Sequence, residues 1–247
     1  MRAAKENVPL KVLGAGANVL VRDDGFDGVV VRLDQPEFRS VTRHGNELEC
    51  GAGVDLMPLT KWCSAEGLSG LEGMAGIPAT VGGAVRMNAG GRDHEFSSVV
   101  RDVRVLGSDG AIETWSANRL GFAYRYSDLG DRIVLSARLG LAEDDPQRVR
   151  RKHDEYFEFK KRSQPLADKS AGCIFKNPNG QSAGALIDRA GLKGLSSGNA
   201  RVSQRHANFI VAGAGATATD VLRLIDMIRD RVRQLFDTQL EVEIDIW

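Results

Sequence analysis

The sequence has no long apolar segment, no paired-cysteine motif and no excess of charge of either sign. Its longest apolar runs are short, such as Val29–Val31, well below the roughly 18 residues that a membrane-spanning helix needs. The N-terminal residues contain no apolar stretch typical of a secretory signal. We therefore expect no association with membranes and a location in the cytoplasm.

The three cysteines and the balanced charge exclude further classes. Cys50, Cys63 and Cys173 are odd in number and lack CxxC spacing, so neither a disulfide framework nor a bound metal is expected. Cys50 and Cys63 fall within strand and helix patterns, and we assign them to the core. Lys and Arg total 33, as do Asp and Glu, so the chain has no net field to attract nucleic acid. An anionic ligand must be held by local groups.

Glycine is abundant, at 28 of 247 residues, and forms two clusters. The first is Gly14-Ala15-Gly16-Ala17-Asn18, which lacks the third glycine of a dinucleotide fingerprint and precedes a strand rather than a helix. This excludes a Rossmann turn and leaves either an anion-binding nest of backbone N–H groups or a simple tight turn. The second cluster, residues 67–91, interleaves glycines with apolar residues, which favours ordered loops that approach one extended, dinucleotide-sized ligand.

The periodicity predicts a mixed α+β chain with two domains, residues 1–145 and 146–247. In the first domain we expect a helix over residues 56–66 and strands over 18–22, 28–33, 47–50 and 132–141, with a hairpin over 99–115. A polar break at 142–146 precedes a charged helix over 147–162. Thr217 to Asp220 has capping-box spacing and opens a second helix. Residues 240–247 alternate as a terminal strand, and the end of the chain from about 238 is expected to return to the active site.

Five segments together resemble one enzyme family: LGAGANVL (13–20), GMAGIPATVGGAVRMNAGG (73–91), FAYR (122–125), GCIFKNP (172–178) and VSQRHANFI (202–210). They occur in the order seen in UDP-N-acetylenolpyruvoylglucosamine reductases, and the resemblance covers essentially the whole chain. It implies a two-part FAD-binding domain of the vanillyl-alcohol-oxidase-like type followed by a smaller α+β substrate-binding domain. It further implies noncovalent FAD, NADPH as co-substrate, and a UDP-sugar enolpyruvyl ether that is reduced to UDP-N-acetylmuramate in peptidoglycan precursor synthesis. We expect a monomer with no protein or nucleic-acid partner.

The resemblance has three departures from the family pattern. The chain opens at what resembles the end of the family's first helix, at residues 2–7, so the preceding strand and most of that helix are expected to be absent. Ala17, Ala79 and Cys173 stand where the family more often has serine, glycine and serine. No tyrosine-bearing insertion lies between Leu141 and Gly172, which indicates the shorter family type.

The resemblance assigns the cofactor and catalytic residues. The FAD would be held by the two glycine-rich segments, through Gly14, Ala15, Gly16, Ala17, Asn18, Gly76, Ile77, Thr80, Gly82 and Gly83, with backbone N–H groups of 14–18 and 80–83 directed at its pyrophosphate. Arg125 would bind the enolpyruvyl carboxylate, for which a two-pronged, permanently charged guanidinium is well suited. Cys173 would donate the proton, because a thiol of ordinary pKa near 8.5 is still mostly protonated at neutral pH. Glu243 corresponds to the family's catalytic glutamate.

Four other residues are candidates for the substrate site, each with a plain alternative. Tyr124 would line the site beside Arg125. Lys176 and Asn177 are substrate ligands by resemblance, although either could be a solvated loop residue. His206 is equally well explained as a core histidine at the start of a strand. Two rival functions also stay open: another FAD oxidase or dehydrogenase of the same flavin fold, and a degenerate, noncatalytic nucleotide-sugar binding protein.

Overall fold

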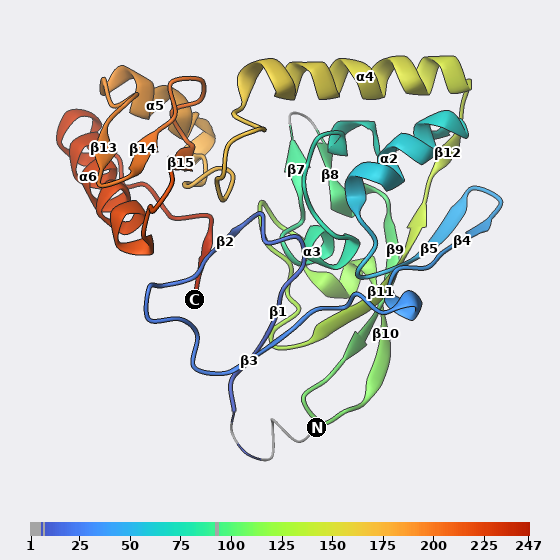
Figure 1. Cartoon of the computed structure of the whole chain (residues 1–247). Coiled ribbons are helices and arrows are strands. Elements are labelled where there is room, and N and C mark those ends of the chain that lie inside the picture. The colour runs from blue at the N-terminus through green and yellow to red at the C-terminus, as the bar shows by residue number, and fades with distance from the viewer. Residues whose placement is uncertain (1–5, 7, 92–93) are drawn as a thin grey trace. The chain divides into compact units, whose positions relative to one another are not determined.

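The computed structural model describes residue 6 and residues 8–91 and 94–247 of the chain. Its contacts divide the chain into two compact units (Figure 1). The first contains residues 1–15 and 27–159, and the second contains residues 16–26 and 160–247. The chain therefore crosses between the units inside the first glycine cluster, between Ala15 and Gly16. Apart from Glu6, the residues expected to end a first helix lie outside the described part.

The first unit is built on a five-stranded antiparallel sheet in the order β10-β9-β11-β5-β4. Helices α2 and α3 pack in one buried cluster with the sheet, and α3 contacts β11 and β5. Short strand pairs complete the unit: β1 with β3, β6 with β12, and β7 with β8. The bounds are β1 Leu10–Val12, β3 Val29–Val31, β4 Val41–His44, β5 Glu47–Gly51, α2 Leu56–Ala65, β6 Leu68–Ser69, α3 Val81–Arg86, β7 Gly90–Gly91, β8 His94–Glu95, β9 Val100–Leu106, β10 Ile112–Ser116, β11 Ile133–Gly140 and β12 Ala142–Glu143.

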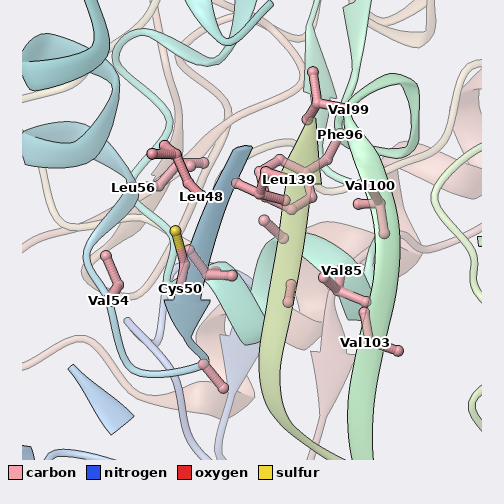
Figure 2. Packing of buried hydrophobic residues seen from close by; sticks show 14 of the residues in the cluster. Leu48, Cys50, Val54, Leu56, Val85, Phe96, Val99, Val100, Val103 and Leu139 are labelled. Atoms are coloured by element: carbon pink, nitrogen blue, oxygen red, sulfur yellow. The ribbon is translucent and has the colours of Figure 1, made fainter. Parts of the chain in front are cut away.

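The core of the first unit lies between the sheet and these helices. Leu48 and Cys50 of β5 and Leu139 of β11 are fully buried, and they pack in one cluster with Val85 of α3 (Figure 2). Helix α2 joins this cluster because Leu56, Leu59 and Cys63 recur at helical spacing and are all buried. The chain then turns at Gly67, whose φ is +71°, so the predicted end of this helix is confirmed.

The second unit contains a three-stranded antiparallel sheet, β13-β14-β15, covered by α6. A parallel pair, β2 with β16, joins residues 19–20 to the C-terminal segment. Helix α4 begins in the first unit and ends in the second. The bounds are β2 Val19–Leu20, α4 Pro146–Ser163, α5 Ala183–Arg189, β13 Ser196–Ser197, β14 Ala200–Val202, β15 Ile210–Ala212, α6 Ala218–Phe236 and β16 Asp245–Ile246.

The predicted α+β class is confirmed, and so are the main helices and the β9–β10 hairpin. Helix α6 begins with the expected capping box, in which Thr217 and Asp220 bond reciprocally. Two expectations are wrong. Residues 81–86, within the second glycine cluster, form a helix rather than a loop. Residues 240–247 are not one strand: Val242 makes an isolated bridge to Phe175, and only Asp245–Ile246 is a strand, because the segment changes partner to β2.

Candidate active site

The two glycine clusters meet in the first unit. A side chain at Gly14 would begin 2.7 Å from the hydroxyl oxygen of Thr80, so only glycine permits this approach. Thr80 is the N-cap of α3 and accepts a hydrogen bond from the N–H of Gly83 at 3.3 Å. The two glycine-rich segments therefore lie close together at Gly14 and Thr80, as the sequence predicted.

The backbone N–H groups of α3 are used differently from our expectation. The N–H of Val81 donates to Val54 O at 2.9 Å, and that of Gly82 donates to Ala52 O at 2.8 Å. Together with the Gly83 bond to Thr80, these contacts occupy the groups that we expected to face a pyrophosphate, so that expectation is wrong for Gly82 and Gly83. Gly82 is needed for packing instead, since a Cβ there would lie 2.9 Å from the Cβ of Ala52. Gly76, before Ile77, has φ +75°.

Arg125 and Tyr124 form the tip of a tight two-residue turn. The backbone groups of Ala123 and Tyr126 exchange hydrogen bonds of 3.1 Å in both directions, which closes the turn. Arg125 adopts φ +54°, a left-handed conformation that is costly for a residue with a side chain. Its Nη2 donates to Gly90 O at 2.9 Å, and its guanidinium lies 5.0 Å from the centre of the Tyr124 ring. Strained backbone of this kind is typical of functional positions.

Three distant segments come together in the second unit around Cys173 and Glu243. The N–H of Glu243 donates to Ile174 O at 2.8 Å, which places the two candidate catalytic residues on adjoining backbone segments. Asn18 Nδ2 donates to Glu243 O at 3.2 Å, and a Cβ at Gly172 would lie 3.4 Å from Ala17 O. The structure thus brings the end of the first glycine cluster to the predicted catalytic pair.

The terminal acidic residues differ in their surroundings. Glu241 and Asp245 are exposed, whereas Glu243 is half-buried. Glu241 Oε1 accepts a hydrogen bond from Lys176 Nζ at 2.6 Å. This exposed ion pair gives Lys176 a local partner at the surface. Glu243 is thereby distinguished from its two acidic neighbours by burial as well as by position.

Asn177 and His206 both take part in holding the second unit together. Asn177 Oδ1 accepts from the N–H of Ala183 at 3.0 Å, at the first residue of α5. His206 lies edge-on to Phe209 with ring centres 5.0 Å apart, and its Nδ1 accepts from the N–H of Asn208 at 3.3 Å. Burial, and then the charge of Lys193, lower the pKa of His206 below 6.5, which favours a neutral ring.

Two buried asparagines near the site were not singled out from the sequence. Asn208 grips the backbone of buried Phe175, accepting from its N–H at 3.0 Å and donating to its carbonyl at 2.8 Å. Asn88 is fully buried in the first unit and donates to Ala123 O at 3.0 Å. Both lie inside the recognised motifs, but nothing in the local sequence shows that these amides are buried.

The other two cysteines lie in the core, as predicted. Cys50 and Cys63 are 0% and 1% exposed, and burial is the largest cause that raises the pKa of each thiol to about 12. Within residues 8–91 and 94–247 no group of three His, Cys, Asp or Glu side chains is arranged to hold a metal ion. No helix in this described part is long and apolar enough to cross a membrane.

Comparisons with known proteins identify the family. A family model described as the C-terminal domain of UDP-N-acetylenolpyruvoylglucosamine reductase matches residues 164–247, and an FAD binding domain model matches residues 1–116. The reductase of Anoxybacillus flavithermus is 40% identical over 98% of this chain and 81% of its own length. The chain belongs to the UDP-N-acetylenolpyruvoylglucosamine reductase family. A reductase of Listeria monocytogenes is 38% identical over 98% of this chain and 81% of its own.

A solved structure of a member of this reductase family agrees with the fold. The UDP-N-acetylenolpyruvylglucosamine reductase (MurB) of Thermus caldophilus has a TM-score of 0.88 and 44% identity, over all of this chain and 88% of that one. The FAD binding domain match contains both glycine clusters, and the C-terminal match contains Cys173, His206 and Glu243. Arg125 lies between the two matched regions.

Proposed function

We propose that this chain is an NADPH-dependent FAD enzyme that reduces UDP-N-acetylglucosamine enolpyruvate to UDP-N-acetylmuramate in peptidoglycan precursor synthesis. Membership of the reductase family supports this activity. The observation that carries it in this chain is the convergence of Asn18, Cys173 and Glu243 through backbone contacts in the second unit. A cofactor-loop residue, a proton donor and a carboxylate are thereby grouped as a reductase requires.

FAD is held noncovalently by residues of both glycine clusters. The close approach of Gly14 to Thr80 brings the two glycine-rich segments together, and a side chain at position 14 would clash with the Thr80 hydroxyl and push them apart. Gly76 and Ile77 complete the first-unit part of this site, and Gly82 and Gly83, whose N–H groups donate to Ala52 O and Thr80 Oγ1, border it without donating to the pyrophosphate. When bound, FAD supplies the chemistry of accepting hydride from NADPH and delivering it to the substrate. Ala15, Gly16, Ala17 and Asn18 continue the site along the chain.

Arg125 binds the enolpyruvyl carboxylate, with Tyr124 beside it. The turn presents a permanently charged guanidinium whose backbone conformation is already fixed at φ +54°. A guanidinium with a settled backbone loses little further freedom when it grips a carboxylate through parallel hydrogen bonds. It also stabilises negative charge that develops next to that carboxylate during reduction.

Cys173 donates the proton to the carbon beside the carboxylate, and Glu243 polarises or positions the reacting end. The thiol forms no disulfide among the described residues. An ordinary thiol retains its proton at neutral pH, whereas a carboxylic acid of ordinary pKa would be ionised. Lys176, Asn177 and His206 contribute to the substrate side in this proposal, in addition to their structural contacts.

The domain assignment, location and oligomeric state are parts of the same proposal. Residues 1–145 are assigned to FAD binding and residues 146–247 to substrate binding, and the return of residues 243–245 to Asn18 supports a C-terminal segment that reaches the active site. We assign the enzyme to the cytoplasm, because nucleotide-sugar precursors and NADPH are cytoplasmic metabolites, and we retain the monomeric state expected from the sequence.

The decisive experiment follows the flavin in two anaerobic steps. NADPH is first added to the purified, FAD-loaded protein and should bleach the visible flavin band. The enolpyruvyl substrate is then added and should restore the band with formation of the lactyl ether. Reduction without reoxidation would favour another flavin oxidase or dehydrogenase, and a protein that stays colourless after incubation with FAD and desalting, yet binds the nucleotide sugar, would favour a noncatalytic binder.

A further inference from the structure

Asn88 forms the centre of a closed hydrogen-bond circuit in the first unit. Its amide nitrogen Nδ2 donates to Glu95 Oε2 at 2.9 Å and to Ala123 O at 3.0 Å. Its Oδ1 accepts from the N–H of Ser97 at 3.0 Å. Asn88 is 0% exposed, and its side chain makes three hydrogen bonds to two other segments, residues 95–97 and Ala123. A buried amide with this many partners fixes those segments relative to one another.

Two branches of this circuit end on Arg125. In the first, Asn88 holds the carbonyl of Ala123, which also accepts from Tyr126 and closes the turn that carries Arg125. In the second, Asn88 holds Glu95, which pairs with Gly90 in the β7–β8 ladder. Gly90 O accepts the hydrogen bond from Arg125 Nη2 at 2.9 Å. The same buried amide therefore helps to fix both the backbone and the guanidinium of Arg125.

A simpler role for Asn88 is the end of a helix. It follows α3 with φ +40°, and its N–H donates to Val85 O at 3.2 Å, an arrangement for which asparagine is a common choice after glycine. That role uses only the backbone and would be filled at least as well by glycine. It does not account for a side-chain amide that reaches Ala123 and Glu95, 35 and 7 residues away in the sequence.

We propose that Asn88 is the positioning residue for Arg125, and that the Asn88–Glu95–Ala123 circuit sets the affinity of the enzyme for the carboxylate of the enolpyruvyl substrate. The inference rests on the proposed function of Arg125 as the carboxylate ligand. Asn88 acts only through Arg125 and does not itself touch the substrate. Removing its amide should therefore impair the half-reaction that involves the enolpyruvyl group and spare the reduction by NADPH.

The test separates the amide from the helix end. Asn88→Gly keeps a residue that accepts φ +40° and removes the side chain. A second variant, Asn88→Asp combined with Glu95→Gln, keeps a hydrogen bond between positions 88 and 95 without placing two carboxylates together, but leaves Ala123 O without its side-chain donor. The control is Asn46→Gly, because Asn46 also donates to a main-chain carbonyl of this unit, Leu141 O at 2.7 Å, outside the circuit.

Both half-reactions are measured anaerobically on the FAD-loaded full chain. For both Asn88 variants, the concentration of enolpyruvyl substrate for half-maximal reoxidation should rise by about tenfold or more, as expected when a charge-holding turn loses a hydrogen bond. The NADPH step should stay within about twofold, as should both steps for Asn46→Gly. In an Arg125→Lys background, Asn88→Gly should add little further effect, because both changes act on the same contact.

The results that would overturn the proposal are distinct from failure of the proposed function. If the parent protein is not reoxidised by the enolpyruvyl substrate, the proposed function itself fails. If the parent works, the positioning role is refuted by equal losses in both half-reactions, by an unchanged enolpyruvyl dependence, or by full additivity with Arg125→Lys. Loss of folding in both Asn88 variants would also refute it, since that result assigns Asn88 to global stability.

Discussion

Two adjacent glycines of α3 should respond oppositely to the same substitution. A methyl group at Gly82 would lie 2.9 Å from Ala52 Cβ and 3.1 Å from Ala52 O, whereas one at Gly83 would meet only Thr80 Oγ1 at 3.4 Å. The backbone at Gly82 has little freedom to retreat, because its N–H donates to Ala52 O at 2.8 Å and Ala52 is 3% exposed. Gly82→Ala should therefore overpack a core contact that Gly83→Ala leaves untouched.

The magnitude follows from two opposing effects. Replacing glycine by alanine within a helix stabilises it by roughly 0.5–1 kcal/mol, and overpacking a well-filled core costs about 1–3 kcal/mol. Gly83→Ala should thus be neutral or slightly stabilising, and Gly82→Ala should be destabilising by about 1–2 kcal/mol. The helix gain is common to both variants, so they should differ by the overpacking cost of about 1–3 kcal/mol. At about 2–4 °C per kcal/mol for a domain of this size, this is a difference in Tm of roughly 2–12 °C.

The assay is thermal unfolding of both variants without FAD, followed by measurement of the flavin that each retains after saturation and desalting. Unfolding is measured first without cofactor because a bound ligand raises the apparent Tm by mass action. Equal Tm values, or a lower value for Gly83→Ala, would refute the packing argument. If Gly82→Ala folded as well as Gly83→Ala yet lost its flavin, the amide of Gly82 would have to act on the cofactor after all.

Three further outcomes are expected. Cys173→Ala should be reduced normally by NADPH but reoxidised by the enolpyruvyl substrate at least ~100-fold more slowly, the low end of general-acid catalysis, with Cys173→Ser remaining active; near-parental turnover of the alanine variant would exclude Cys173 as the acid. Arg125→Lys should raise the concentration of enolpyruvyl substrate for half-maximal reoxidation about tenfold or more, because lysine lacks the paired donors. The concentration of NADPH for half-maximal reduction should not change, and equal effects on both would contradict a carboxylate role. Hydrogen bonds from Thr219 and Ala218 lower the pKa of Asp23 below 3.8, so the folded state binds this proton more weakly than the unfolded state, and the resulting stability is present above that pH and lost as the pH falls below it. Thermal melts from pH 6 down to pH 3 should accordingly show a shallower acid loss for Asp23→Asn than for the parent, and parallel curves would show that Asp23 does not contribute.

The elements that the sequence predicted well are those whose signals are local. Helix α6 has its capping box and an apolar stripe that includes Val221, Leu224 and Ile228, all within one stretch of chain. The β9–β10 hairpin has a turn at Gly110 with φ +88° between two alternating segments. In each case the periodicity and the end signal point to the same element, and tertiary contacts only reinforce it.

Helix α3 escaped prediction because its composition argues against a helix. Two glycines among six residues lower its intrinsic stability, and the interpretation as a loop followed from them. Its local signals were nevertheless present: Thr80 caps it, and Val81, Ala84 and Val85 recur at helical spacing and are buried. Tertiary bonds to Val54 O and Ala52 O offset the weak propensity, and such bonds cannot be read from sequence.

Nothing in the local sequence indicates that residues 16–26 belong to the second unit. Asn18 contacts Glu243 across 225 positions of sequence, and the carboxylate of Asp23 accepts from the first N–H groups of α6, 195 and 196 positions away. A carboxylate at that end of a helix is favourable both as a hydrogen-bond acceptor and as a charge near the positive end of the helix dipole. The sequence placed these residues on a strand but could not show which sheet or helix they would join.

In both units, a buried asparagine fixes the backbone of a segment that carries a proposed site residue. Asn88 holds Ala123 O beneath the turn of Arg125, and Asn208 grips both backbone groups of Phe175, two residues beyond Cys173. Because the amides bind main chain rather than the functional side chains, those side chains can change chemically while their backbone stays in place. This is consistent with cysteine at position 173, where the family resemblance leads us to expect serine. The β-bridge between Cys173 and Phe209 and the hydrogen bond from the N–H of Glu243 to Ile174 O involve only backbone atoms. Substituting Cys173, the proposed proton donor, should thus alter the acidity of the site more than its geometry.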